Sequence, residues 1–251
     1  ERVAGGWRLT GTKVWTSGAH EADAFVALAR SAPADAGHRH DGLSQFLVDL
    51  RAPGVQVRPI LSMGGEHHLN EVHLDGVLVP DDRVVGQIGA GWRQVSAELG
   101  FERSGPERFL STFPLLAAAA EAMEDGRVPL DAGLGRQVAR VAGLHHLSAG
   151  VAVALESRLD AEGPSVAGTT AAGGATPAAD ITAAAVKVLG TTTEGDIADY
   201  VDTLSATGWV QEEDLYRLLH AAILRRPGFT LRGGTNEILR GVIARGLGLQ
   251  R

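Results

Sequence analysis

Histidine, serine and glycine are the residue types whose spacing in this sequence could report directly on chemistry. Nine histidines are present, including the adjacent pairs His67-His68 and His145-His146. None has the His-Glu-x-x-His spacing that places two metal ligands on one face of a helix, so we expect no metal site. Ser17 lacks the Gly-x-Ser-x-Gly surroundings of a hydrolase nucleophile. The glycine pairs belong to no strand–loop–helix unit, which argues against a dinucleotide fingerprint.

The composition limits the classes of function further. The chain has 251 residues, of which 44% are apolar, so it can bury a large core. Its formal net charge is −7, and an acidic chain is a poor partner for nucleic acid. The absence of cysteine excludes disulfides and a cysteine nucleophile. No apolar run reaches the roughly 18 residues of a membrane span, and no signal peptide is visible, so we expect a cytoplasmic protein.

The elements that must position any site differ between the two parts of the chain. Up to about residue 90 the sequence has short apolar runs separated by Gly and Pro, which predicts a small antiparallel β-barrel or sandwich. Runs at 7–9 and 13–15 flank Gly11-Thr12 like the strands of a hairpin. The remaining expected strands lie near 24–29, 43–50, 55–60, 71–74 and 77–79.

The pattern changes to helical spacing after Gly91 and predicts an antiparallel helical bundle. Helices are expected near 91–124, 132–160, 181–203, 212–224 and 235–247. The stretch from about 161 to 180 is rich in Gly, Ala, Thr and Pro, which predicts a flexible loop. The fold class is therefore α+β, with one domain over 1–90 and another over 91–251.

Four segments resemble the acyl-CoA dehydrogenase family in order and spacing, and together they span nearly the whole chain. They are Gly11–Gly18 (GTKVWTSG), Gly42–Val55 (GLSQFLVDLRAPGV), Asn70–Trp92 (NEVHLDGVLVP…VGQIGAGW) and Gly233–Arg245 (GGTNEILRGVIAR). The resemblance implies the middle β-domain and the C-terminal helical domain of such an enzyme. It also implies that the N-terminal helical domain of the family is absent, and we expect this sequence to be part of a longer gene product.

The family removes hydrogen from the α- and β-carbons of an acyl-CoA to give a 2-enoyl-CoA. The resemblance thus implies FAD as cofactor, acyl-CoA as substrate and an electron-transfer flavoprotein as electron acceptor. It also implies a homo- or hetero-oligomer.

Several positions match the family's flavin-binding segments. Trp15, Thr16 and Ser17 resemble the segment that packs beside the flavin ring, while Thr235 and Glu237 match positions that contact FAD. Thr235 can also be read as a helix N-cap, and the two interpretations are compatible.

The position at which many family members carry the catalytic glutamate is not a glutamate in this sequence. The glutamate that precedes Gly-Thr in those members is Gly233 here, which keeps only its backbone N–H to bind the thioester oxygen. Other members carry the base on the first helix of the helical domain. Counting from Gly89 places Glu102 there, followed by Arg103 as a substrate-site arginine. In the alternative without a catalytic role, Glu102 is a surface residue paired along the helix with nearby arginines.

Pro106 complicates this assignment, because its ring clashes with the carbonyl four residues earlier, that of Glu102. We expect a kink or bulge there, and Glu107 is the second candidate base. A family arginine that reaches FAD across subunits has no clear counterpart, although Arg127 could substitute. Two alternatives stay open: a non-catalytic FAD-binding partner subunit of a heteromeric dehydrogenase, and a flavin monooxygenase or oxidase on the same fold.

Overall fold

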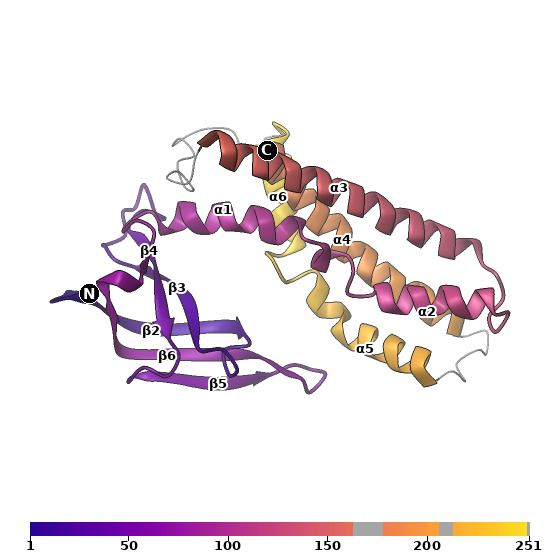
Figure 1. Cartoon of the computed structure of the whole chain (residues 1–251), viewed down its shortest axis with the longest axis horizontal. Coiled ribbons are helices and arrows are strands. Elements are labelled where there is room, and N and C mark those ends of the chain that lie inside the picture. The colour runs from indigo at the N-terminus through magenta and orange to yellow at the C-terminus, as the bar shows by residue number, and fades with distance from the viewer. Residues whose placement is uncertain (163–177, 206–212, 250–251) are drawn as a thin grey trace. The chain divides into compact units, whose positions relative to one another are not determined.

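A computed structural model gives the structure of the protein and describes residues 1–162, 178–205 and 213–249 (Figure 1). The chain forms two compact units, Glu1–Ser96 and Ala97–Arg251. Their boundary lies inside helix α1 (Gly91–Ser104), six residues after the predicted domain boundary at 90/91. Each unit has its own core and is described by itself.

The first unit contains two antiparallel sheets. The larger sheet has the order β1 (Arg2–Val3), β2 (Gly6–Ser17), β6 (His67–Pro80), β5 (Val55–Leu61). The smaller sheet has the order β3 (Ala24–Arg30), β4 (Leu43–Asp49), β7 (Val84–Val85), and the 3₁₀ turn η1 (Asp81–Arg83) precedes β7. Both sheets are antiparallel, as predicted for this part of the chain.

Alternation of apolar and polar residues explains why these strands share a core. Trp7 and Leu9 on β2 are buried while Arg8 between them is exposed, because successive side chains point to opposite faces of a sheet. The rings of Trp7 and Phe46 approach to 5.6 Å between centroids and join the two sheets. The other fully buried members of this core are Val48, Val72 and Val77.

The predicted hairpin at Gly11-Thr12 is wrong. Gly11 lies inside the continuous strand β2, where the pairing with β6 shifts between Leu9 and Gly11. Its φ of +148° belongs to the region that glycine adopts readily, so the residue marks a β-bulge instead of a turn. Likewise the expected strands at 71–74 and 77–79 form the single strand β6.

The second unit is helical. Its elements are the end of α1, η2 (Pro106–Arg108), α2 (Phe113–Glu124), α3 (Ala132–Glu162), α4 (Ala178–Leu204), α5 (Glu213–Phe229) and α6 (Asn236–Gly246). One apolar cluster runs through α2, α3, α4 and α5 and includes Leu116, Leu155, Ile197 and Val201, all at most 2% exposed. The expected loop at 161–180 falls mostly on residues outside the described ranges.

The predicted helix over 91–124 is interrupted at the residue that the sequence analysis singled out. Helix α1 ends at Ser104, Pro106 opens the short η2 turn, and α2 begins at Phe113. Proline has no N–H for the helix ladder, so the helix cannot continue through this position. The interruption produces the turn that carries Glu107 and Arg108 beside the end of α1.

One helix departs from the expectation that no segment could cross a membrane. By length and composition alone, the part of α3 from Ala132 to Ser157 is long and apolar enough to do so, and 28% of its most apolar window is buried. Val138, Leu147 and Val153 are among its exposed apolar side chains. This surface of α3 is apolar and largely uncovered in the described chain.

Candidate active site

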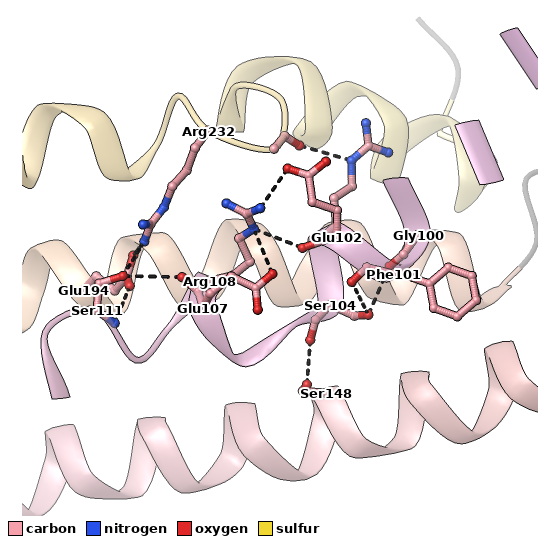
Figure 2. Close-up of polar contacts among 12 residues, drawn as sticks. Gly100, Phe101, Glu102, Ser104, Glu107, Arg108, Ser111, Ser148, Glu194 and Arg232 are labelled. Atoms are coloured by element: carbon pink, nitrogen blue, oxygen red, sulfur yellow. Dashed lines mark hydrogen bonds and ion pairs between the residues drawn. The ribbon is translucent and has the colours of Figure 1, made fainter. Parts of the chain in front are cut away.

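The end of α1 places Glu102 beside an arginine from the following turn (Figure 2). The guanidinium of Arg108 donates a 2.7 Å hydrogen bond from Nη2 to Oε1 of Glu102. Its Nε donates at 3.0 Å to the backbone carbonyl of Glu102, the group for which Pro106 offers no N–H. Arg108 is 8% exposed, so it both completes the helix end and fixes the Glu102 carboxylate.

The same helix end is tied to α3. Ser148 donates from Oγ to the carbonyl of Ser104 at 2.5 Å, and the Ser104 hydroxyl donates to the carbonyl of Gly100 at 3.0 Å. The bond from Ser148 satisfies the Ser104 carbonyl, which lies in the last turn of α1 and has no partner within the helix (Figure 2). The position of Glu102 is therefore set by both α3 and η2.

The turn before α6 brings Gly233 to Glu102. Gly233 has φ +66° and Gly234 has φ +89°, a left-handed backbone that suits glycine. A Cβ atom added to Gly233 would lie 3.6 Å from Oε1 of Glu102 and 3.5 Å from Cζ of Arg108. Arg103 donates from Nε to the Gly233 carbonyl at 3.2 Å. The structure thus gathers Glu102, Arg103 and Gly233, three residues that the sequence analysis assigned to one site.

Glu107 occupies a different position. Its carboxylate lies 3.8 Å from Nε of Arg108 and folds back over Gly105, where an added Cβ would meet it. Its side chain is 56% exposed, compared with 44% for Glu102. Figure 2 shows Arg108 between the two glutamates. Glu102, and not Glu107, is the carboxylate that approaches Gly233.

Two further charged residues hold the turn, and the sequence analysis missed both. Arg232 donates from Nη2 to Oε2 of Glu194 at 2.5 Å and to the Ser111 hydroxyl at 2.8 Å. Glu194 is fully buried, and its Oε1 accepts from the Ser111 N–H at 2.9 Å. Glu194 could have been noticed in the sequence, because it is a charged residue within the apolar pattern of α4.

The segment at the end of β2 presents an exposed aromatic side chain next to two hydroxyl groups. Trp15 is 66% exposed and has φ +65°, a rare backbone for a bulky residue, inside the register shift between Lys13 and Thr16. Asn70 fixes the segment by donating to the Thr16 carbonyl at 3.1 Å. The hydroxyls of Thr16 and Ser17 have no hydrogen-bond partner among the described residues.

The start of α6 carries the other two predicted cofactor residues. Thr235 is the N-cap, and its Oγ1 accepts from the N–H of Ile238 at 3.4 Å. The backbone N–H of Glu237, followed by the Thr235 hydroxyl and by Arg240, holds the pKa of the Glu237 carboxyl below its usual value. Glu237 is therefore ionised and exposed at a helix N-terminus.

The remaining predicted groups lie outside these clusters. Arg127 forms an ion pair with Asp125 at 3.0 Å. In the ranges that the structure describes, no group of three or more His, Asp or Glu side chains is arranged to hold a metal ion.

Comparison with known proteins identifies relatives for both units. Residues 1–77 match the family model described as the acyl-CoA dehydrogenase middle domain. Acyl-CoA dehydrogenase FadE34 of Mycobacterium tuberculosis is 37% identical over 254 residues, covering 100% of this chain and 32% of the relative. Acyl-CoA dehydrogenase FadE29 of the same organism is 32% identical over 246 residues, covering 94% of this chain and 59% of the relative.

A solved structure agrees with these relatives along the whole chain. The Tcur3481-Tcur3483 steroid ACAD has a TM-score of 0.77 and 27% identity, covering 100% of this chain and 62% of the solved chain. This chain thus spans about a third of the length of FadE34 and about three fifths of that of FadE29. The two antiparallel sheets and the helical unit correspond to the middle and C-terminal domains of the family. Along its whole length the chain is therefore similar to acyl-CoA dehydrogenases, and residues 1–77 match the middle domain of that family.

Proposed function

We propose that this chain carries the catalytic helical domain of an FAD-dependent acyl-CoA dehydrogenase, with Glu102 as the general base. The observation that supports this most is the 3.6 Å separation between Oε1 of Glu102 and the position of a Cβ on Gly233. Members with a glutamate at the position of Gly233 extend its side chain from that point. A carboxylate that comes from α1 instead reaches the same place, so the site keeps a base although the turn supplies none.

The residues of the turn suit proton removal from the α-carbon of a thioester. Glu102 takes the proton, and the N–H of Gly233, which donates to no group in the described chain, donates to the thioester oxygen. Arg103 and Arg108 add positive charge beside the oxygen on which negative charge develops. Arg108 must release or share the Glu102 carboxylate when substrate binds, because the ion pair occupies one of its oxygens.

The cofactor-binding residues fit FAD by their exposure and chemistry. The exposed indole of Trp15 offers a flat apolar face, and the free hydroxyls of Thr16 and Ser17 can donate to a ring nitrogen. Thr235 and Glu237 at the N-terminus of α6 would contact another part of the cofactor. Bound FAD would supply the acceptor for the hydride that leaves the β-carbon.

The proposal extends to the partners of the protein. Electrons pass to an electron-transfer flavoprotein, the protein works in the cytoplasm, and the exposed apolar surface of α3 is covered in an oligomer. A second candidate is a non-catalytic FAD-binding subunit of a mixed oligomer. The ion pair between Arg108 and Glu102 and the missing glutamate at Gly233 favour this alternative.

The test uses the full-length protein with bound flavin and a panel of acyl-CoA substrates. We expect a substrate to bleach the flavin absorbance, and Glu102→Gln to slow this reaction by about 10²-fold or more, since a general base contributes that much. Glu107→Gln is the matched control, because it removes the neighbouring carboxylate, and it should leave the rate within about threefold.

Each other outcome points elsewhere. Equal rates for wild type and Glu102→Gln would show that Glu102 is not the base. A bound flavin that no substrate bleaches, but that gains activity with a co-encoded homologue, would establish the partner-subunit alternative. Rapid oxygen consumption by the reduced flavin would instead indicate an oxidase or monooxygenase.

A further inference from the structure

A row of polar side chains on α4 faces the interior of the helical unit. Lys187, Thr191 and Glu194 recur at intervals of four and three residues, which places them on one face of the helix. Their exposed fractions are 0%, 1% and 0%. Burying charged and polar groups costs free energy unless each group is hydrogen-bonded. We therefore expect each of these three side chains to have a hydrogen-bond partner on another element.

The partners of Lys187 are the two ends of the turn that contains Gly233. Its Nζ donates to the Thr230 carbonyl at 2.8 Å and to Oδ1 of Asn236 at 2.8 Å. The N–H of Asn236 donates to the same Thr230 carbonyl at 3.1 Å. Thr191 donates to Oδ1 of Asn236 at 3.2 Å. Lys187 and the Asn236 N–H thus hold together the two ends of the segment 230–236, which contains Gly233.

We propose that Lys187, supported by Thr191 and Asn236, is a positioning residue that fixes the 230–236 turn on α4 and thereby sets the place of the Gly233 N–H relative to Glu102. The proposal rests on the proposed function, because it gives a catalytic meaning to that N–H. Lys187 itself touches neither Glu102 nor Gly233 among the described contacts, so it acts through the backbone of the turn.

The burial and the charged neighbours of Lys187 fit a residue that holds the turn in place. Burial first, and then the positive charges of Arg108, Arg232 and Arg103 against the opposing Glu237, lower the pKa of Lys187 to about 8. The neutral amine still carries two N–H groups for its two acceptors. The anchor therefore persists through the change of protonation, which suits a positioning role.

The experiment measures hydrogen exchange at the backbone amides of 231–235 in the full-length protein. Lys187→Met removes both bonds with little change in volume, and exchange of these amides should rise by about tenfold or more, as expected for the loss of one or two hydrogen bonds. Val201→Ala is the control: Val201 is equally buried on α4 and lies about 21 Å further along the helix. It should lower thermal stability without accelerating exchange in the turn.

The kinetic readout separates positioning from general stability. Lys187→Met should slow flavin reduction at saturating acyl-CoA by about tenfold, whereas Val201→Ala should leave it within about threefold. Thr191→Val removes the hydroxyl whose proton is shared between the Lys187 carbonyl and Oδ1 of Asn236, and it leaves both bonds of the Lys187 amine in place. This variant serves if Lys187→Met does not fold, and it should accelerate turn exchange by a smaller factor.

Unchanged turn exchange in a folded Lys187→Met or Thr191→Val protein would overturn the proposal, as would an equal increase in Val201→Ala. If wild-type protein is reduced by no acyl-CoA, the proposed function fails, and the exchange measurement still decides whether Lys187 positions the turn.

Discussion

At the scale of single residues, the missing side chain of Gly233 leaves room for the carboxylate of Glu102. Its left-handed backbone and the closeness of Arg108 and Glu102 leave ordinary van der Waals space for one methyl group. A longer side chain would have to share this space with the Glu102 carboxylate. The space beside Gly233 is therefore occupied in this chain by the carboxylate of Glu102, which comes from α1.

Gly233→Ala tests the backbone requirement at this position. We expect the free energy of unfolding to fall by about 1–2 kcal/mol, because a Cβ makes positive φ unfavourable. Gly143→Ala is the matched control, since Gly143 lies in α3 with open space around an added Cβ and should gain about 1 kcal/mol. Both values come from denaturant unfolding, and an unchanged or stabilised Gly233→Ala would contradict a fixed left-handed turn.

At the scale of elements, the break after α1 and the buried polar side chains of α4 each fix a neighbouring segment of the candidate site. Pro106 ends α1 and frees a carbonyl that Arg108 then binds, so the break orients the side chain that holds Glu102. Helix α4 contributes Lys187 and Glu194 to the turn before α6, the second through Arg232. These elements hold the site through backbone carbonyls as much as through side chains.

The lowered pKa of Lys187 predicts a rise of stability with pH. Between its folded pKa of about 8 and its ordinary 10.5, the folded state binds fewer protons than the unfolded state, so the free energy of unfolding increases. The penalty is fully present below pH 8, and its relief amounts to about 2 kcal/mol between pH 8 and 9.5. Lys187→Met should lack this rise, which denaturant unfolding across the range would reveal.

The upper limit of this pH window comes from Tyr200. Burial and the hydrogen bond to Asp131 raise its pKa to about 12, so above pH 10 the folded state keeps a proton that the unfolded state loses, and stability falls. Measurements are therefore compared below pH 10. An equal pH dependence in wild type and Lys187→Met would contradict the shifted pKa.

At the scale of the whole molecule, the two units have separate hydrophobic cores. Trp7, Phe46 and Val72 belong to the core of the first unit, while Leu116 and Leu155 belong to the core of the second. The predicted cofactor residues are divided between them, with Trp15 to Ser17 in one and Thr235 and Glu237 in the other.

Separate cores predict separate responses to core mutations. Leu116→Ala should cost about 2–5 kcal/mol and accelerate exchange of the most protected helix amides within 97–251, which exchange only when the whole unit unfolds, with little change within 1–96. Val72→Ala, at 0% exposure, should do the opposite. Loss of protection in both units from either mutation would show that the units unfold as one.

The sequence alone predicted the strand-to-helix order and the resemblance to the acyl-CoA dehydrogenase family, and it proposed the residues of the candidate site. Glu102, Arg103 and Gly233 were proposed as site residues because the resemblance to the family aligns them with its site positions, and the missing N–H of Pro106 predicted the break in α1. The bulge at Gly11 could not be told from a turn, because the same glycine backbone suits both and only the pairing with β6 distinguishes them.

Only the tertiary structure decided which glutamate faces Gly233, because Glu102 and Glu107 stand on either side of a break whose geometry no spacing rule predicts. It alone also assigned Arg108, Lys187 and Glu194, whose partners lie between 6 and 83 residues away in the chain. Periodicity identifies which side chains are buried together along one element. The contacts of a buried charge depend on what the other elements bring to it, and that is a property of the folded chain.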